Sequence, residues 1–399
     1  MAEVAVLGYG TVGSGVVEVI ENNRDVISKR CEGLHVKYIL DLRDFPGDPY
    51  EDRVVHDFDC IINDPEVKIV CETMGGATFA YNYTKACLEA GKSVCTSNKE
   101  LVEKYGAELS RIAAGHSCSY LFEASVGGGI PLIRTINEAL TAEKIERIYG
   151  ILNGTTNYIL YRMETAGLDF KAALCEAQEF GYAEKDPTAD IEGHDPCRKI
   201  AILASLVMGK KVDYTKILME GIKDLSIKDI EYAKAAGMCI KLIAMSEFKN
   251  GGCYCMVSPR LIAASNPLSI VKDVFNAVLI HSDMLDDSMY YGRGAGKLAT
   301  ASAVVGDAVE CANNIGKTVS CGWSEEEAQL ADIDDLEQSY FVRVKDEAAG
   351  AFKAAVKTKD CVLEGIAEGE KGYFTESMTE GGFKKAIAGL DGVIGYIRM

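Results

Sequence analysis

The sequence predicts an α/β protein with three parts: a parallel sheet at the N-terminus, an α+β middle region and a C-terminal βαββαβ module. Three observations support this prediction. A short apolar run at residues 4–7 is followed at once by a glycine-rich turn and a stretch with one apolar face. Strand-like and helical stretches then alternate through residue 98. From residue 336, six segments follow in the order strand, helix, strand, strand, helix, strand.

The composition is that of a globular protein with room for two or three domains. The chain has 399 residues, 48% of them hydrophobic, and a formal net charge of −18. That charge repels nucleic acid and anionic membranes, so neither is expected as a partner. The fourteen cysteines do not show the spacing of zinc ligands. The start shows no signal-peptide pattern and no apolar run would span a bilayer, so we expect a cytoplasmic protein.

The first turn has the GxGxxG spacing that binds dinucleotides. The segment "GYGTVG" stands between a strand and a helix, which is the context that this motif needs. Gly8 would make the tight turn, Gly10 would let the backbone approach a pyrophosphate, and Gly13 would let the helix pack closely. The helix N-terminus would bind the phosphates, whereas the alternative is a purely structural turn. The expected cofactor contacts are Gly8, Gly10, Thr11, Val12 and Gly13.

Three further strand-like runs follow, at residues 35–40, 68–73 and 93–98. With helical stretches between them, they predict a doubly wound, Rossmann-type parallel sheet. Ligands of such sheets bind at the carboxyl ends of the strands. The residues expected there are Asp41, Thr73, Gly75, Thr96, Ser97 and Lys99.

Asp41 and Arg43 leave the choice between two cofactors open. An acid after the second strand would bind ribose hydroxyl groups and favour NAD. Arg43 could instead bind the 2′-phosphate of NADP. A solvated strand end is the third interpretation.

The middle region combines an acid-rich loop with a lysine on an apolar helix. Residues 149–163 predict a strand, a turn and a helix, and residues 168–180 predict a second helix that Gly181 would cap. The acid-rich loop follows. Asp195 and Pro196 then predict the N-cap and the first residue of a helix that runs to Gly209.

Lys199 falls in the first turn of that helix, four residues after Asp195. This spacing is typical of a surface ion pair, which is one interpretation. In the other, the helix N-terminus and partial desolvation hold the pKa of the lysine below its ordinary value of about 10.4. Such a lysine suits proton transfer near neutral pH, while the acids could bind the ammonium group of a substrate.

Several motifs in one order resemble the homoserine dehydrogenase family over most of the chain. They are "VLGYGTVGSGV", "TSNKELV", "EASVGGGIPLI", "ILNGTTNYIL", "GYAEKDPTADIEGHD" with a following Arg-Lys, and "GRGAGKLATASAVVGD". The resemblance implies NAD(P)-dependent interconversion of L-aspartate 4-semialdehyde and L-homoserine, on the route to threonine, methionine and isoleucine. The alternatives are a non-catalytic sensor of nucleotide and amino acid, or another dehydrogenase of the same fold that acts on a small amino acid.

The resemblance also assigns roles to single residues. It places the proton-relay lysine on Lys199 and a second active-site lysine on Lys99. The sequence departs from the family at Pro196, where the family usually has another residue. This proline could make Asp195 a helix cap and weaken its role towards the substrate. The implied substrate-binding residues are Glu184, Asp190, Asp195, Gly154 and Thr155. Further implied cofactor contacts are Gly181, Gly294 and Gly296, and the implied sodium-type cation site, built largely from backbone carbonyls, is Glu123, Val126, Gly128 and Ile130.

The C-terminal segment, residues 336–399, resembles an ACT domain, which binds amino acids as effectors. Its first turn departs from the usual Pro-Gly, because it has Ala349-Gly350. The resemblance implies a threonine effector site and pairing between chains, and a simple dimerisation module is the alternative. We therefore expect a homodimer or homotetramer. The expected domains are residues 1–130 for NAD(P), to which about 290–320 return, residues 131–330 for substrate binding and dimerisation, and residues 336–399 for regulation.

Overall fold

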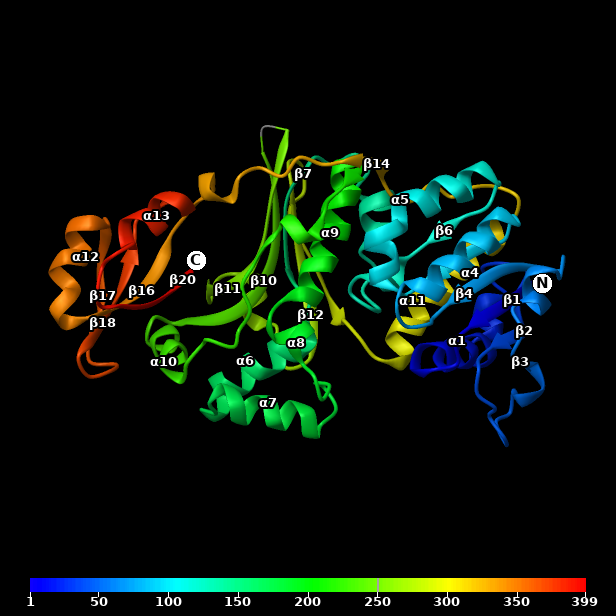
Figure 1. Ribbon diagram of the computed structural model, residues 1–399, viewed down its shortest axis with the longest axis horizontal. Helices are drawn as coiled ribbons and strands as arrows, with labels where there is room; N and C mark the ends of the chain where they lie inside the picture. Colours follow the sequence, from blue (N-terminus) through cyan, green and yellow to red (C-terminus); the bar gives the residue numbers. More distant parts are fainter. Residues whose placement is uncertain (250) are drawn as a thin grey trace. The chain divides into compact units, whose positions relative to one another are not determined.

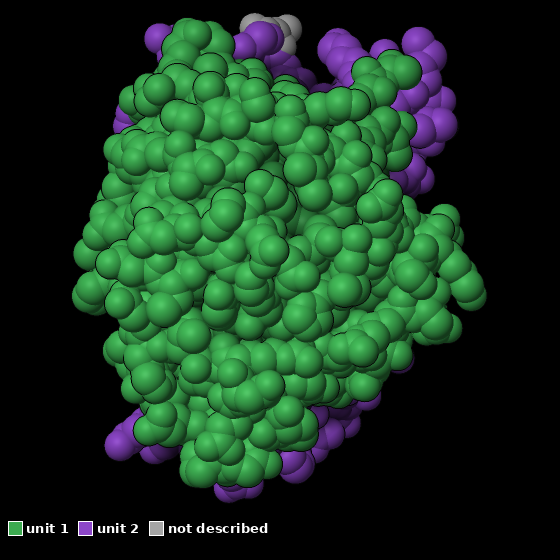
Figure 2. Space-filling view, turned by 90° about the vertical axis from the view of Figure 1, so that its right-hand side faces the viewer, with its two compact units in different colours: residues 1–142, 201–214, 292–328 green, residues 143–200, 215–291, 329–399 purple. Residues whose placement is uncertain are grey.

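A computed structural model describes residues 1–249 and 251–399. The chain divides into two compact units, which Figure 2 shows in green and purple. Helix α9 (His194–Met208) leaves the second unit and enters the first between residues 200 and 201. The first unit comprises residues 1–142, 201–214 and 292–328, and the second comprises residues 143–200, 215–291 and 329–399.

The first unit is built on a six-stranded parallel sheet with the order β3-β2-β1-β4-β5-β6 (Figure 1). The chain order reverses between β1 and β4, which is the point where ligands of doubly wound sheets bind. The predicted strands are all present, although β5 ends two residues before the predicted end. The strands are β1 (Ala2–Leu7), β2 (Leu34–Leu40), β3 (Val54–Val55), β4 (Val67–Glu72), β5 (Ser93–Thr96) and β6 (Tyr120–Leu121).

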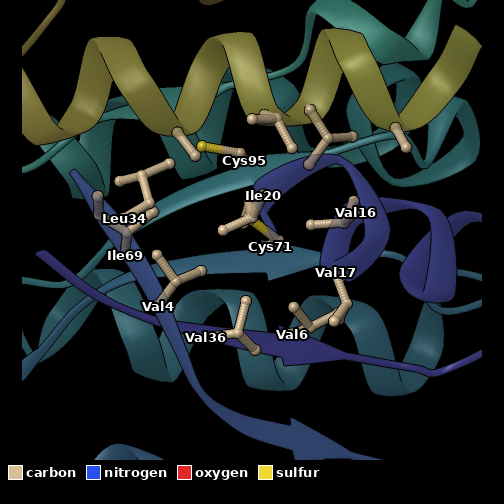
Figure 3. Close-up of a cluster of buried hydrophobic side chains, with 14 of the residues drawn as sticks. Val4, Val6, Val16, Val17, Ile20, Leu34, Val36, Ile69, Cys71 and Cys95 are labelled. Atoms are coloured by element: carbon tan, nitrogen blue, oxygen red, sulfur yellow. The ribbon is translucent and has the colours of Figure 1, made fainter. Parts of the chain in front are cut away.

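Helices cover both faces of this sheet. On one face, α1 (Thr11–Asn22) packs against α11 (Lys297–Asn313), and on the other lie α4 (Thr78–Glu89) and α5 (Lys99–Gly115) (Figure 1). Figure 3 shows the core on the first face, where Val16, Val17 and Ile20 of α1 meet side chains of β1, β2, β4 and β5. Fully burying each such valine or isoleucine contributes about 1.5–3 kcal/mol.

Helix α11 lies in the first unit although it comes late in the chain, and it completes the core between α1 and the sheet. The full set of expected domain boundaries, near residues 130 and 330 with a separate segment 336–399, stays a prediction. Shorter elements of the first unit are α2 (Arg24–Ile27), α3 (Asp59–Ile62) and the paired strands β8 (Lys210–Lys211) and β14 (Ser324–Glu327).

The second unit is built on a mixed sheet with the order β13-β12-β7-β10-β11-β20-β16-β18-β17, in which β9 also pairs with β11. Its middle strands are β7 (Ile145–Ile151), β9 (Leu218–Met219), β10 (Met238–Lys249), β11 (Gly252–Ala263), β12 (Phe275–Ser282) and β13 (Asp286–Arg293). Its helices before the C-terminal segment are α6 (Gly154–Ala166), α7 (Phe170–Glu179), α8 (Thr188–Ile191) and α10 (Ile227–Ala235).

The C-terminal segment has the predicted βαββαβ order, and its strands lie side by side as β20-β16-β18-β17. Tyr340 stacks on Phe383 in its core, with the ring centroids 3.7 Å apart. Strand β20 also pairs with β11, at Arg398 and Arg260, so the C-terminal sheet continues into the sheet of the middle region within one chain. The predicted fold class is therefore confirmed. The elements are β16 (Tyr340–Lys345), α12 (Ala349–Ala355), β17 (Thr358–Leu363), β18 (Glu370–Thr375), α13 (Glu380–Ile387) and β20 (Val393–Arg398), with β15 (Glu337–Gln338) pairing β19 (Met378–Thr379).

A buried ion pair fastens β20 to the rest of the second unit. Arg398 is 1% exposed and donates to Glu380 Oε1 at 2.6 Å and to Glu220 Oε1 at 2.8 Å. Burial would raise the pKa of Glu380, but the hydrogen bonds and charge of Arg398 outweigh it and lower that pKa to about 2. Among the residues described, no helix is both long and apolar enough to cross a membrane.

We predict that Arg398→Met destabilises the protein by about 3–5 kcal/mol at neutral pH, because the buried Glu380 carboxylate loses its buried cation and keeps the more exposed Lys384, 3.4 Å away. The pKa of Glu380 in the folded state lies below its ordinary value of about 4.3. The stability that the pair contributes is therefore present above about pH 4.3 and is lost as the pH falls towards 2, so the difference from wild type should shrink over that range.

Urea unfolding at several pH values measures this difference. Lys371→Met is the matched control, because Lys371 pairs with Glu364 at the surface and such pairs contribute about 0–1 kcal/mol. Equal losses in the two variants would contradict the prediction.

Candidate active site

The glycine turn after β1 has the geometry that a dinucleotide requires. Gly8 has φ +89°, in the left-handed region that favours glycine. A Cβ atom on Gly13 would lie 1.8 Å from the Gly8 carbonyl oxygen and 2.7 Å from Thr73 Oγ1. Only glycine at position 13 therefore lets α1 approach the turn this closely, which is the role that the sequence predicted for it.

Gly10 stands before α1 with open space around it. A Cβ atom there would meet no atom within 4 Å, and no side chain caps the helix. Thr11 and Val12 form the first turn of α1, whose backbone N–H groups can bind an anion such as a pyrophosphate. The turn therefore fits a dinucleotide cofactor.

The Asp41 carboxylate follows β2 and accepts hydrogen bonds on both oxygens. Oδ2 accepts from the Tyr9 backbone N–H at 2.8 Å and from Arg43 Nη2 at 3.0 Å, and Oδ1 accepts from Arg43 Nε at 3.0 Å. The Arg43 guanidinium holds the pKa of Asp41 well below its usual range, although burial opposes this effect. Asp41 is therefore not a simple solvated strand end, since it forms a bidentate pair with Arg43 beside the glycine turn.

The turns after β4 and β5 carry the remaining residues expected at this edge. Thr73 Oγ1 donates to the Gly8 carbonyl at 2.9 Å, which brings the end of β4 against the glycine turn. Thr96 is buried at the end of β5, and Lys99 begins α5. Gly75 is exposed and Ser97 is partly exposed. The first unit thus brings the predicted residues from four strand ends, those of β1, β2, β4 and β5, to one edge of its sheet.

In the second unit, the predicted start of the lysine-bearing helix needs a correction. Helix α9 begins at His194 and not after Asp195, so Asp195 is its second residue and Lys199 lies in its second turn. The left-handed Gly193, with φ +90°, precedes the helix, and its carbonyl accepts from the Cys197 N–H at 3.0 Å. The sequence placed the start too late because Asp-Pro is a strong local signal for an N-cap.

Lys199 and Asp195 form a buried pair rather than a surface ion pair, with 8% and 5% of their surfaces exposed. Lys199 Nζ donates to Asp195 Oδ2 and to the Leu152 carbonyl, each at 2.7 Å. Asp195 Oδ2 also accepts from Asn153 Nδ2 at 2.8 Å, so this oxygen binds two side chains instead of capping the helix.

Asn153 is a site residue that the sequence interpretation missed. Its side-chain oxygen caps α6 through the Thr156 N–H at 2.9 Å, and its amide nitrogen donates to both Asp195 and Asp190. The distance to Asp190 Oδ1 is 2.7 Å. An asparagine before a helix signals the cap, but a sequence does not show that the same amide joins two acids from another segment.

The other predicted substrate residues lie on α6, on α8 and on the loop before α8. Asp190 lies in α8, and Glu184 is exposed on the loop before it. Thr155 Oγ1 donates to the Tyr182 carbonyl at 2.6 Å, which ties α6 to the acid-rich loop. Gly154 begins α6, where a Cβ atom would lie 2.6 Å from the Val274 carbonyl oxygen.

The segment expected to hold a cation is a tight turn in the first unit. Two backbone hydrogen bonds form this turn: the Ile130 N–H donates to the Gly127 carbonyl, and the Gly129 N–H donates to the Arg293 carbonyl. Neither acceptor belongs to a predicted cation ligand. The Glu123 carboxylate accepts from the backbone N–H groups of Leu132, Ile133 and Arg134. The group of Glu123 that could bind a cation is therefore its backbone carbonyl. The predicted ligand residues Glu123, Val126, Gly128 and Ile130 are all buried. Their carbonyl oxygens as ligands of a monovalent cation stay a prediction.

The three remaining glycines mark close approaches or turns. Gly181 follows α7 with φ +72°, and Gly296 precedes α11 with φ +120°. Gly294 is buried, and its carbonyl oxygen would lie 2.6 Å from a Cβ atom on Gly128. Their contacts with a cofactor stay predictions.

Two matches cover most of the chain. Residues 8–123 match the family described as "Homoserine dehydrogenase, NAD binding domain", and residues 131–309 match the family "Homoserine dehydrogenase". A homoserine dehydrogenase of Synechocystis sp. is 37% identical over 97% of this chain and 90% of its own length. That of Bacillus subtilis is 37% identical over 88% of this chain and 82% of its own length. The chain belongs to the homoserine dehydrogenase family.

Solved structures agree with this membership. The crystal structure of a homoserine dehydrogenase from Thiobacillus denitrificans has a TM-score of 0.89 at 31% identity, and the match covers 100% of this chain and 97% of that one. A hyperthermophilic archaeal homoserine dehydrogenase mutant in complex with NADPH has a TM-score of 0.64 at 26% identity, covering 78% of this chain and 97% of that one. The chain is thus an NAD(P)-dependent oxidoreductase, as predicted, and the roles of its single residues stay predictions.

We predict that Gly10→Ala leaves folding unchanged but weakens binding of NADH and NADPH about tenfold or more, because the methyl group enters the space left for a pyrophosphate. Gly13→Ala should both lower the melting temperature and abolish binding, because its Cβ overlaps the Gly8 carbonyl. Cofactor fluorescence and thermal melting measure these effects.

The matched control is Gly115→Ala at the end of α5, where a Cβ atom also meets nothing within 4 Å. If Gly10→Ala binds cofactor as well as Gly115→Ala does, the assignment of the turn is wrong.

Proposed function

We propose that the chain interconverts L-aspartate 4-semialdehyde and L-homoserine, and that Lys199 moves the proton at the substrate oxygen. The observation that carries this proposal is a lysine that is only 8% exposed and is held by a carboxylate and a backbone carbonyl among further acids. A structural ion pair needs no such collection of acids around it, whereas an amino-acid substrate does.

Two anchors fix the Lys199 ammonium group in direction. They are Asp195 Oδ2 on the same helix and the Leu152 carbonyl at the end of β7, each 2.7 Å from Nζ. A positioned proton donor is what reduction of an aldehyde to an alcohol requires, because the developing alkoxide must be protonated. In the reverse direction the neutral amine would accept the proton from the hydroxyl group of homoserine.

The acids around Lys199 provide the complementary charge for an amino-acid substrate. Asn153 joins Asp190 to Asp195 through one amide group, so the two carboxylates are held on neighbouring segments. Glu184 lies on the exposed loop that Thr155 ties to α6 through Tyr182. We assign Glu184 and Asp190 to binding of the substrate ammonium group, since an ammonium ion is best held by several carboxylate oxygens.

NAD or NADP, when bound, supplies or accepts the hydride at the carbonyl carbon. The glycine turn of this chain binds the pyrophosphate, and the turns after β4 and β5 bind the remainder of the cofactor. Asp41 can bind a ribose hydroxyl group, and Arg43, whose guanidinium is largely exposed, can bind a 2′-phosphate. We therefore propose that both cofactors are used, which the ratio of kcat/KM values for NADH and NADPH in wild type and Arg43→Ala would test.

We also propose a monovalent cation at the turn of residues 123–130, where it would hold the backbone in one conformation. Support comes from the burial of the four predicted ligand residues and from the Glu123 carboxylate, which accepts from three backbone N–H groups. Thermal melting in sodium against choline chloride is the measurement, and equal melting temperatures would exclude the site.

We predict that Lys199→Ala lowers kcat about 100-fold or more, because a positioned general acid is lost. Cofactor affinity should change little. The melting temperature should fall, because the buried Asp195 carboxylate keeps its bond to Asn153 but loses the Lys199 ammonium group. The initial rate of NADPH oxidation with L-aspartate 4-semialdehyde measures the effect, and Lys171→Ala, an exposed lysine of α7, is the matched control. Near-normal kcat in Lys199→Ala would move the proton donor elsewhere, with Lys99 as the next candidate.

The C-terminal segment is proposed to bind threonine and to take part in a homodimer or homotetramer of a cytoplasmic enzyme. A cavity of about 810 Å³ in the second unit supports the first part. It lies where β20 meets the segment 219–229, and side chains of both charge signs line it, including Lys223, Asp224, Lys228 and Asp229. Such a lining suits a zwitterion, whose carboxylate and ammonium groups need opposite partners.

The wall of this cavity is bonded to the segment that carries Asp190. Lys223 Nζ lies 2.9 Å from Glu192 Oε1, and the Ile222 N–H donates to the Ile191 carbonyl at 2.8 Å. A ligand that shifts Lys223 would therefore act on α8 directly. Size-exclusion chromatography with light scattering tests the oligomeric state, and a monomeric mass would exclude that part of the proposal.

We predict that threonine inhibits the enzyme and that Gly395→Val raises the half-inhibitory concentration about tenfold, a coupling change of ordinary size. Gly395 lines the cavity, and a Cβ atom there meets nothing within 4 Å, so valine adds bulk without strain. The activity without threonine should stay unchanged, as it should in the control Glu364→Gln, whose residue does not line the cavity. If threonine does not inhibit the wild-type enzyme, the proposed regulation is wrong. If threonine inhibits Gly395→Val and wild type equally, the cavity is not its binding site.

A further inference from the structure

Glu72 is a buried acid at the cofactor edge of the first unit, and the proposed mechanism does not use it. It is the last residue of β4, has no exposed surface, and stands between Leu7 of β1 and Thr96 of β5 in the sheet. The two residues before it in β4, Val70 and Cys71, are fully buried and apolar. A buried strand position of this kind is normally apolar too, because a carboxylate loses its hydration there.

The carboxylate of Glu72 bonds to both turns that follow the central strands. Oε1 accepts from the Met74 backbone N–H at 2.7 Å, and Oε2 accepts from Thr96 Oγ1 at 2.5 Å. Burial raises the pKa of Glu72 to about 7 against the opposing effect of these hydrogen bonds. The cost of burying the acid is thus only partly offset, which indicates a use other than packing.

A chain of hydrogen bonds extends from this carboxylate to α5. Thr96 Oγ1 accepts from the Asn98 backbone N–H at 2.9 Å while it donates to Glu72. The Asn98 side chain then caps α5 through the Leu101 N–H at 3.1 Å and donates to the Gly76 carbonyl at 2.7 Å. One buried group therefore fixes the turn after β4, the turn after β5 and the start of the helix that begins with Lys99.

We propose that Glu72 is a positioning residue that, through Thr96 and Asn98, holds residues 73–76 and 96–99 in the conformation that binds the nicotinamide cofactor. This inference rests on the proposed function, which assigns cofactor binding to the same two turns. Glu72 has no exposed surface, so it acts through its neighbours. Its effect on cofactor binding comes from the two turns, which lie at the carboxyl ends of β4 and β5 where ligands of such sheets bind.

The experiment compares substitutions along the chain of bonds in the full-length protein. Thr96→Val keeps the side-chain volume but removes the hydroxyl, and Thr96→Ser keeps the hydroxyl. Glu72→Gln keeps the shape of the acid but replaces the oxygen that accepts from Thr96. Dissociation constants for NADH and NADPH are measured by fluorescence, melting temperatures by circular dichroism, and KM for homoserine by steady-state assay.

We expect Thr96→Val and Glu72→Gln each to weaken cofactor binding about tenfold, as loss of a buried hydrogen bond would. The dissociation constant of Thr96→Ser should stay within about twofold of the wild-type value. The double variant with Glu72→Gln and Thr96→Val should bind the cofactor no more weakly than the weaker-binding of the two single variants, because both residues belong to the same chain of hydrogen bonds. In every variant, the KM for homoserine should change by a smaller factor than the dissociation constants for NADH and NADPH.

Thr84→Val is the matched control, because Thr84 is also a fully buried threonine of the first unit and its hydroxyl has no hydrogen-bond partner among the residues described. The proposal is overturned if Thr96→Val binds cofactor like wild type, if Thr96→Ser weakens binding as much as Thr96→Val, or if Thr84→Val has the same effect. Should Glu72→Gln fail to fold, the two Thr96 variants decide. Absence of homoserine turnover in wild type would refute the proposed function alone, since the fluorescence titrations do not depend on homoserine.

Discussion

A charge that is withdrawn from water must be compensated by a partner, and this constraint organises both units of the chain. In the second unit, Lys199 is buried and bonded to Asp195 and a backbone carbonyl, and Asn153 holds that acid in turn. The lysine can be placed there only because α9, β7 and the start of α6 present these partners together. Burial without them would cost several kcal/mol, so the site forms only in the complete fold.

The first unit meets a second constraint, which is the close approach of backbone to ligand. Gly13 removes the atom that would collide with the Gly8 carbonyl, and Gly10 leaves space that no protein atom fills. Thr73 then bonds the end of β4 to the same turn, and Asp41 bonds to the backbone of Tyr9. The cofactor edge is therefore a rigid arrangement of several strand ends, and catalysis by orientation needs such rigidity.

The C-terminal segment, for which regulation is proposed, is joined to the large sheet of the second unit. Strand β20 joins the C-terminal segment to β11, and Arg398 bonds Glu380 of α13 to Glu220 before α10. A cavity beside these residues contacts the segment that is bonded to α8 through Ile191 and Glu192. The C-terminal segment is thus connected to the acid-rich loop by short bonded steps. The proposed effector would act through its different affinity for two conformations of this connection.

The sequence alone determined the order of elements, the glycine turn and the family, because each depends on residues close together in the chain. A strand followed by GxGxxG is a local pattern, and so is the helical spacing of apolar residues that ends at Gly181. Both have local physical causes. The sequence misplaced the start of α9, because the local capping signal of Asp195-Pro196 competed with long-range bonds that direct the Asp195 side chain to Asn153 and Lys199. It also missed Asn153 and Glu72. Only the tertiary structure shows what they bond to, because each has partners from other segments, and a one-dimensional pattern does not record which buried polar groups will meet.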